Sequence, residues 1–257
     1  MKHIKKSFLE QTTSEKFDVI KTDLPWTEAS DFSSENLKGR KGDLIYVETA
    51  KGIVYGGFVQ KIENNYCIFP VPDPTLVHFH SAQMNHIHAK ELRKKLVTSL
   101  SAEEIKKETP IHDLYNYYGY TTAVIVNLFT ALEAFLNQQI PSEYKYIVNT
   151  PKKTEIFNHQ QIFETIDFKT KLTKIIPEVA GKNFMHNDTP TNGYIWSLKE
   201  FRDSVIHTKP KNESPLYQDL MKKSLDYKYD KAIEAVAKLM NFYQPGYIVE
   251  CDCGNDY

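Results

Sequence analysis

Apolar residues recur along the chain with two different periods, and the change of period divides the sequence into two parts. Between residues 42 and 71, three runs of β-forming residues (44–47, 53–59 and 66–71) are separated by short turn signals. Runs of this length between turn residues predict antiparallel strands. We therefore predict three strands of a small sheet, and residues 1–41 either add a strand to it or wrap around it. The sheet is expected to end at closely spaced prolines, because proline lacks the ladder donor and restricts the residue before it: Pro70, Pro72 and Pro74.

From about residue 81 the apolar positions recur with the period of an α-helix. The strongest stripe has spacings of mostly three, four or seven residues: Ile111, Leu114, Tyr118, Ile125, Leu128, Leu132, Phe135 and Ile140. Such spacing predicts one long amphipathic helix, ending near Pro141. Weaker stripes predict further helices at 158–165, 168–178, 192–208 and 228–243.

These patterns predict an α+β protein, in which a small antiparallel β-rich segment precedes a mainly α-helical bundle. The expected boundaries are 1–80 for the β-rich segment, 81–109 for a helical connector, 110–245 for the helical domain and 246–257 for a C-terminal tail. A bundle of about five helices buries its apolar stripes by packing helix against helix.

The overall charge and composition exclude several classes of protein. The 32 Lys and Arg residues nearly balance 33 Asp and Glu residues, so no global field attracts nucleic acid or an anionic membrane. The most apolar stretch, 123–136, is interrupted by Asn127, Thr130 and Glu133 and falls short of the roughly 20 apolar residues of a membrane span. We therefore expect no membrane partner. Three sparse cysteines and no secretion leader predict a cytoplasmic protein.

The end of the predicted helix at 192–208 carries three chemically capable side chains, Arg202, Asp203 and His207. Each helical residue advances about 100°, so Asp203 and His207 should lie about 40° apart, within hydrogen-bond reach. Arg202 lies about 140° from His207, so only its long side chain brings the guanidinium to a shared site. Histidine moves protons near neutral pH, arginine matches phosphate oxygens, and a carboxylate can orient the imidazole. The set suits RNA cleavage without a metal or other cofactor.

Three further residues are expected to support this site. Lys209 and Lys211 lie just beyond the helix end and can hold flanking phosphates. Glu133 falls at the edge of the long apolar stripe, where an unpaired carboxylate is costly, so we expect a partner for it, either Arg202 or a tyrosine. Structural alternatives stay open. Arg202, Asp203 and His207 can form a solvated salt-bridge cluster at a helix end, and Glu133 an ordinary buried ion pair.

Arg202, the polar Asp203, three more residues and His207 resemble the arginine, polar residue, three residues, histidine motif of the HEPN superfamily. The motif lies on the helix before the last long one, as it does in that family. The segment 129–137 is similar to the family's first core helix, which often carries an alanine, glutamate and aromatic run. The resemblance covers about 110–245 and leaves out the β-rich part. Asp203 departs from the pattern, since asparagine is frequent there and a negative charge repels phosphate.

The resemblance implies a metal-independent endoribonuclease, in which the ribose 2′-hydroxyl attacks the adjacent phosphate and leaves a cyclic phosphate end. Arg202 would stabilise the phosphate, His207 would act as acid or base, and Asp203 would orient His207. It also implies an RNA substrate, a homodimer, and a toxin or phage-defence role with an antitoxin or other regulatory protein. Because other members only bind, a non-catalytic module for a protein or nucleic-acid partner is the alternative. A structural unit regulated by ligands at the β-rich end is a third.

Histidines, cysteines and tyrosines elsewhere give weaker signals. Four histidines match no standard zinc spacing, and two residues apart on a helix they would point in diverging directions: His78, His80, His86 and His88. A soft metal site or an oxidising pair is one interpretation of the cysteines, and a frayed tail with free thiols is the simpler one: Cys251 and Cys253, with Cys67 distant. The tyrosines within 115–120 favour core packing and an oligomer contact over RNA stacking.

Overall fold

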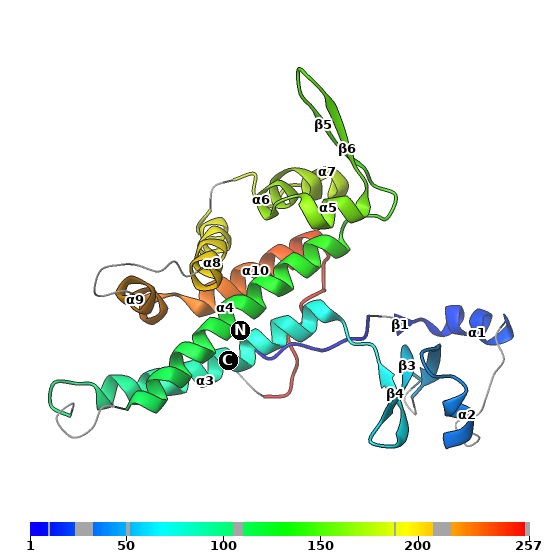
Figure 1. Cartoon of the computed structure of the whole chain (residues 1–257), viewed down its shortest axis with the longest axis horizontal. Helices are drawn as coiled ribbons and strands as arrows, with labels where there is room; N and C mark the ends of the chain where they lie inside the picture. The colour runs from blue at the N-terminus through cyan, green and yellow to red at the C-terminus, as the bar shows by residue number, and fades with distance from the viewer. Residues whose placement is uncertain are drawn as a thin grey trace. The chain divides into compact units, whose positions relative to one another are not determined.

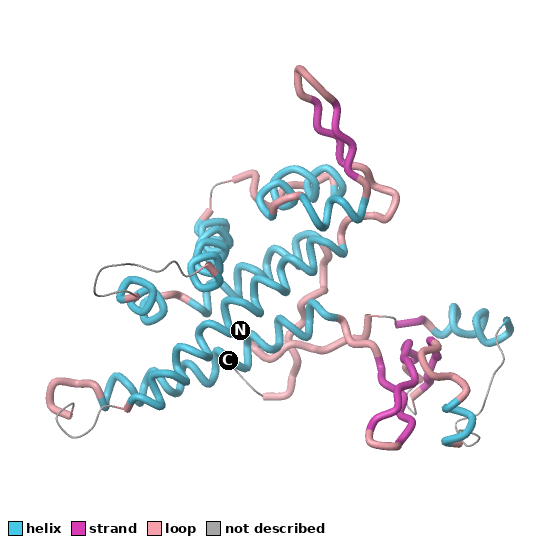
Figure 2. Tube along the Cα trace, in the orientation of Figure 1, coloured by secondary structure: helices cyan, strands magenta, loops and turns pink. Residues whose placement is uncertain are grey.

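The structure is a computed structural model that describes residues 1–9, 11–23, 33–49, 52–104, 110–187, 189–207 and 217–254. The chain forms two compact units, Lys6–Val77 in one and Met1–Lys5 with His78–Tyr257 in the other. The first unit carries a four-stranded antiparallel sheet, while the second is mostly helical (Figure 2). The predicted α+β class, with an N-terminal sheet before a helical remainder, is confirmed.

The sheet is built around one long central strand, β3 (Val54–Ile62). β2 (Leu44–Glu48) pairs with one edge of β3, and β4 (Asn65–Pro70) and the short β1 (Gln11–Thr12) pair with the other. Three of these strands lie where the sequence predicts them, and β1 lies within residues 1–41, where an added strand was one of two expectations. Glu63 and Asn64 both have positive φ, which is the geometry of a tight two-residue hairpin turn between β3 and β4.

One face of the sheet is covered by a short helix. α2 (Ser34–Lys38) contributes Leu37, which packs with Ile45 and Val59 into a small apolar cluster. α1 (Ser14–Asp23) precedes it in the chain. β4 ends at Pro70 as expected, but the next helix, α3 (Pro74–Ser99), begins well before residue 81. The physical reason is that proline is pre-organised for a first helical turn, and the Asp73 carboxylate accepts from the Thr75 N–H at 2.9 Å.

The helical unit is organised around α4 (Ile111–Gln138), against which α8 (Pro190–Ile206) and α10 (Tyr229–Tyr243) pack (Figure 1). The predicted stripe forms its buried side, with Leu128, Leu132 and Phe135 fully buried. By length and composition α4 is apolar enough to cross a membrane, despite its three polar interruptions. However, 50% of its most apolar window is buried inside the structure.

The rest of the helical unit contains predicted and unpredicted elements. α5 (His159–Thr165) lies where expected. The helix predicted at 168–178 is present as α6 (Phe168–Thr170), a π-helical turn η2 (Lys171–Ile175) and α7 (Ile176–Ala180). Not predicted were the hairpin of β5 (Tyr146–Asn149) with β6 (Thr154–Phe157) and the helix α9 (Gln218–Asp226).

The first and last segments of this unit pair with each other. Ile4 forms an antiparallel bridge with Glu250, the Lys5 N–H donates to the Val249 carbonyl at 2.7 Å, and the Cys251 N–H donates to the His3 carbonyl at 2.6 Å. The side chain of Ile4 is buried. The expectation of a frayed C-terminal tail is therefore wrong as far as Cys251, because the N-terminal residues supply a backbone partner for it.

Candidate functional site

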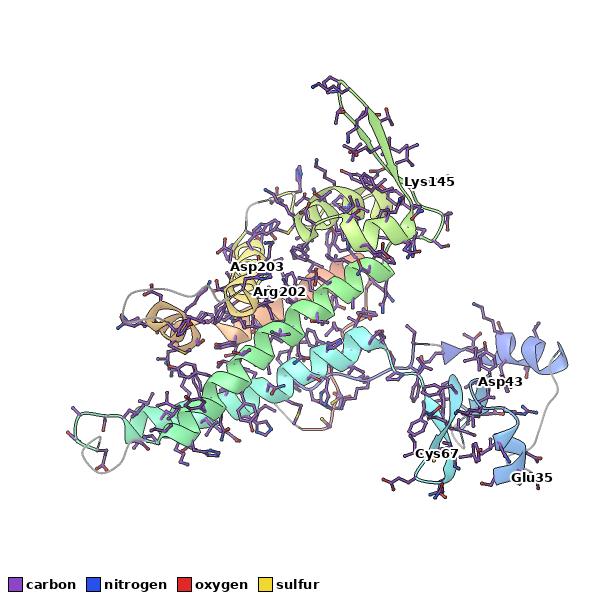
Figure 3. All side chains as sticks on the ribbon, viewed as in Figure 1. Glu35, Asp43, Cys67, Lys145, Arg202 and Asp203 are labelled. Atoms are coloured by element: carbon purple, nitrogen blue, oxygen red, sulfur yellow. The ribbon has the colours of Figure 1, made fainter. Side chains whose placement is uncertain are left out.

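The helix α8 fixes the position of the arginine and aspartate of the HEPN-like motif. It begins two residues earlier than predicted, with Thr189 as N-cap and Pro190 in the first turn. Its buried side chains Ile195, Leu198 and Phe201 hold it against the core. Arg202 and Asp203 follow this anchor, so both lie at the margin of the buried face, with side chains 31% and 36% exposed (Figure 3).

Arg202 is held on two sides. Its Nη1 donates to Asp203 Oδ1 at 3.1 Å, and its Cζ lies 4.9 Å from the ring centroid of Phe129 on α4. A guanidinium over an aromatic face is attracted by the ring quadrupole. Phe129 is itself almost completely buried. The arginine is therefore positioned by both α8 and α4 and does not sweep freely through solvent.

Asp203 is the acceptor for two cations. Lys199, one turn earlier on α8, donates to Asp203 Oδ2 at 2.6 Å, and Arg202 donates to the other oxygen. Partial burial opposes ionisation of this carboxyl, but the hydrogen bonds from Lys199 and Arg202 outweigh burial and hold its pKa below the ordinary value. Asp203 is thus an ionised group that orients Arg202.

Glu133 lies on α4, one turn after Phe129, and its pKa shifts in the direction opposite to that of Asp203. Burial raises its pKa, and the positive charges of Arg202 and Lys171 reduce that rise. Arg202 is thus its strongest electrostatic partner, as the sequence suggested, although no hydrogen bond joins the two among the described residues. A carboxyl with a raised pKa beside a guanidinium is the kind of perturbed group found at functional sites.

Lys171 brings a third cation to this cluster from the π-helical turn η2. Its side chain is buried, and its Nζ donates to Asn137 Oδ1 at 3.1 Å and to the Phe163 carbonyl at 3.3 Å. Burial lowers its pKa, while Glu133 and Asp167 raise it. Single π-helical turns inside helices are frequent at functional sites. Lys171 thus adds a second positive charge that interacts with Glu133.

His207 stands apart from these groups. α8 ends at Ile206, and His207 is the C-cap with φ −107° and ψ 46°. The expected hydrogen bond between Asp203 and the His207 ring is wrong, since that carboxylate is taken by Lys199 and Arg202 and the backbone leaves helical geometry at His207. The imidazole is exposed, and the described part of the chain supplies no side-chain hydrogen bond to it. Among the described residues, no hydrogen bond joins Arg202 to His207. Lys209 and Lys211 lie outside the described residues.

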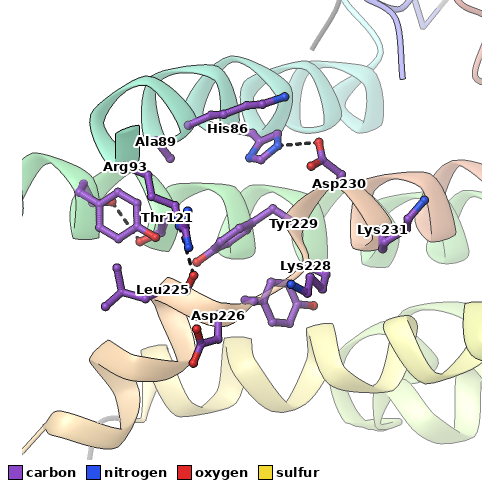
Figure 4. A pocket seen from close by; sticks show the side chains of 13 residues that line it. His86, Ala89, Arg93, Thr121, Leu225, Asp226, Lys228, Tyr229, Asp230 and Lys231 are labelled. Atoms are coloured by element: carbon purple, nitrogen blue, oxygen red, sulfur yellow. Dashed lines mark hydrogen bonds and ion pairs between the residues drawn. The ribbon is translucent and has the colours of Figure 1, made fainter. Parts of the chain in front are cut away.

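A second arrangement, which the sequence did not reveal, surrounds His86 on α3. His86 Nε2 lies 2.8 Å from Asp230 Oδ1 on α10 (Figure 4). The imidazole is 7% exposed and the carboxylate 53%. The hydrogen bond from His86 is the main cause that lowers the pKa of Asp230. The pair lines a cleft of about 380 Å³.

Two tyrosines form the floor of this cleft. The hydroxyls of Tyr117 and Tyr229 both donate to the Ser224 carbonyl at 2.9 Å. Burial raises the pKa of Tyr117 to about 12, so it remains a neutral donor near neutral pH. The hydroxyls are thereby committed to the backbone, which indicates a packing role for them.

The four histidines of α3 have separate neighbours. His78 Nδ1 lies 3.2 Å from Asn127 Oδ1, His88 packs on Tyr120, and His80 packs on His3. With His86 facing Asp230, these side chains do not converge on one point. No sequence signal connects His86 with Asp230, because the two lie 144 positions apart.

No protein-family model, curated protein or solved structure matches the chain. Its function is therefore inferred from its own side chains.

Proposed function

We propose that this protein is a metal-independent endoribonuclease of the HEPN type, which acts as a homodimer with Arg202 and His207 of both copies in one cleft. The observation that carries the proposal is the state of Arg202. Phe129 and Asp203 fix its guanidinium at the surface, and 31% of the side chain stays exposed. A guanidinium held in this way retains N–H donors for the planar recognition of phosphate.

His207 supplies the group that moves protons. Its ring is exposed on the same helix end as Arg202, and no described side chain holds either ring nitrogen. Histidine is suited to general acid and base catalysis near neutral pH. In a twofold dimer, each Arg202 would stand beside His207 of the partner subunit and the site would be complete.

The reaction follows from these roles. His207 takes the proton from a ribose 2′-hydroxyl, whose oxygen attacks the adjacent phosphorus. The bond from phosphorus to the 5′-oxygen breaks, this oxygen takes a proton from water, and the hydroxide so formed removes the proton from His207. The products are a 2′,3′-cyclic phosphate and a 5′-hydroxyl end. Arg202 stabilises the charge that develops on the phosphate oxygens, and Glu133 supports Arg202 electrostatically.

An enzyme of this kind damages the cell that holds it unless it is restrained. We place the protein in the cytoplasm as a toxin or phage-defence effector, with an antitoxin or other regulatory protein as partner and no membrane partner. The test of that role is expression in a bacterial host, where wild type should arrest growth and His207→Ala should not.

The enzymatic proposal is tested by RNA cleavage in the presence of EDTA, with end-labelled RNAs of diverse sequence. Wild type is expected to leave cyclic phosphate ends, and Arg202→Ala and His207→Ala should each lose activity. His186→Ala is the matched control, because His186 is also exposed but lies before the other end of α8. Circular dichroism checks that each variant remains folded.

A mixing experiment tests the shared cleft. Arg202→Ala combined with His207→Ala should recover part of the activity, since the mixed dimer retains one intact Arg202 facing one intact His207 across the interface. Recovery is not expected if each copy works alone.

The competing function is a non-catalytic module that binds a protein or nucleic-acid partner. It is favoured by the engagement of Arg202 with Asp203 and Phe129, which a purely structural arginine would also show. RNA binding by wild type without cleavage of any RNA would reject the enzymatic proposal and support this alternative.

A further inference from the structure

Three potential metal ligands from opposite ends of the sequence lie together in the helical unit. His3 Nδ1 lies 3.0 Å from Cys251 Sγ and 3.3 Å from Cys253 Sγ. The two sulfur atoms are 2.7 Å apart. All three ligand atoms fall within 4.8 Å of one another. One imidazole and two thiols at this separation form a set that is chemically suited to a soft metal ion.

The backbone holds this cluster in place. The antiparallel pairing of residues 3–5 with 249–251 sets His3 directly opposite Cys251. The buried side chains of Ile4 and Ile248 anchor the two segments in the core. On its other side, the His3 ring packs edge-on against the His80 ring at 5.2 Å. The approach of the three ligands is thus a product of the fold and not of two loose ends.

We propose that His3, Cys251 and Cys253 bind one zinc ion, which fastens residues 3–5 to residues 249–253. Zinc takes cysteine sulfur and histidine nitrogen in tetrahedral geometry. Three protein ligands leave a fourth position for water or another donor. Two thiolates and a neutral imidazole balance the charge of the ion, and two thiol protons are released on binding.

The cluster needs a small rearrangement to accept the ion. Two thiolates on a tetrahedral zinc lie about 3.8 Å apart, given a zinc–sulfur bond of about 2.3 Å. The sulfur atoms must therefore separate by about 1 Å from their present distance. Cys253 is exposed, so rotation of its side chain toward solvent provides this movement without disturbing the paired backbone of Cys251.

Cobalt(II) is the probe, because it occupies tetrahedral zinc sites and reports thiolate ligation by charge-transfer absorption in the near ultraviolet. The full chain is reduced, freed of metal and titrated. Wild type is expected to show this absorption with saturation at one ion per chain, and zinc should displace the cobalt. Cys67→Ser is the matched control, since Cys67 lies on β4 in the other unit, and it should behave as wild type.

The ligand variants make the assignment specific. The double substitution Cys251→Ser with Cys253→Ser should abolish the charge-transfer band, and His3→Gln should shift it and weaken cobalt binding at least tenfold. Saturating zinc should raise the Tm of wild type and of Cys67→Ser by about 5 °C or more. No such rise is expected in the double variant.

Two results would overturn the proposal. One is the absence of cysteine-dependent absorption in reduced wild type, which decides the question even if a variant fails to fold. The other has two parts: protein isolated without reductant has a mass lower by two hydrogens, and it takes up no metal after reduction. In that case Cys251 and Cys253 serve as a disulfide. RNA cleavage is measured separately in EDTA, so failure of the zinc site leaves the nuclease proposal standing, and the reverse also holds.

Discussion

The end of α8 and the cleft between α3 and α10 each hold a histidine. The two histidines differ in burial and in hydrogen bonding. His86 is buried and hydrogen-bonded to Asp230 at 2.8 Å. His207 is exposed at a helix end, and the described residues provide no side-chain partner for it. The first histidine is fixed by the fold, whereas the second is open to a ligand. Exposure at the end of the helix that carries the fixed Arg202 therefore favours α8 as the place for chemistry on an external substrate.

The carboxylates of the two regions show the same contrast. The hydrogen bond from His86 lowers the pKa of Asp230, and burial raises the pKa of Glu133. Asp230 is held ionised by a partner, while Glu133 is held closer to its protonated form despite nearby cations. The pKa values of these two carboxyls thus shift in opposite directions, by a hydrogen-bonded partner at Asp230 and by burial at Glu133.

The largest expected effect separates the two histidines by function. His207→Ala should lower RNA cleavage by about 10²- to 10⁴-fold, the usual contribution of a general acid or base. Its stability should change by no more than about 0.5 kcal/mol, because the side chain is exposed. Single-turnover cleavage and urea unfolding measure the two quantities. Loss of cleavage in His86→Ala to the same extent would remove the functional distinction between the regions.

The second expected effect is a loss of stability without a loss of cleavage, at His86. His86→Ala should lower the free energy of unfolding by about 1–3 kcal/mol, since it removes a buried side chain and its hydrogen bond to Asp230. Cleavage measured well below the Tm should be unchanged. His112→Ala is the control, because His112 is an exposed histidine on α4. Equal stability of the two variants would show that the His86 pair contributes nothing.

The parts of the fold that sequence could predict are those governed by local periodicity. The α4 stripe was recognisable because Leu128, Leu132 and Phe135 recur on one helical face, and these residues are indeed buried. The strands β2 to β4 were recognisable from turn residues between β-formers. The hairpin β5–β6 was missed, since its strands of four residues each are too short for a clear alternation.

The candidate site was predictable only in part, because its geometry depends on contacts between distant residues. Arg202 and Asp203 are neighbours in the chain, so the sequence alone brings them to the same end of a helix. The expected pairing of Asp203 with His207 required both to be helical, and the helix ends one residue too early. Contacts such as His86 with Asp230 and His3 with Cys251 arise from tertiary packing, which no local pattern encodes.

A pH experiment sharpens the contrast between the carboxylates. The folded-state pKa of Glu133 is raised, so its contribution to stability is fully present below its unfolded pKa of about 4.3 and is lost as the pH rises through the folded value. Glu133→Gln lacks this contribution. As the pH rises through that window, the free energy of unfolding of Glu133→Gln should therefore increase relative to that of wild type. Urea unfolding at a series of pH values measures this difference. A constant difference would contradict the raised pKa.

Asp230 should give the opposite sign. Its folded-state pKa is lowered, so its contribution is present above the unfolded pKa of about 3.9 and is lost as the pH falls through the folded value. Asp230→Asn should be less stable than wild type at neutral pH, and the two should converge in acid. Because this carboxylate is 53% exposed, solvent screening makes the difference small. Asp43→Asn, at an exposed position before β2, is the control.

The smallest expected effect concerns Lys199, which shares Asp203 with Arg202. Lys199→Ala removes an ion pair one turn apart on a partly exposed helix face, for which about 0.3–0.5 kcal/mol is typical. The free energy of unfolding should fall by only this amount. The change in RNA cleavage, however, should identify the role of Asp203. Without Lys199, the whole negative charge of Asp203 acts on Arg202 and on an incoming phosphate, so RNA binding should weaken while the rate of the bound complex is kept. A fall in the rate of the bound complex instead would show that Lys199 positions Arg202 through Asp203, and the α8 cluster would then act as one rigid unit.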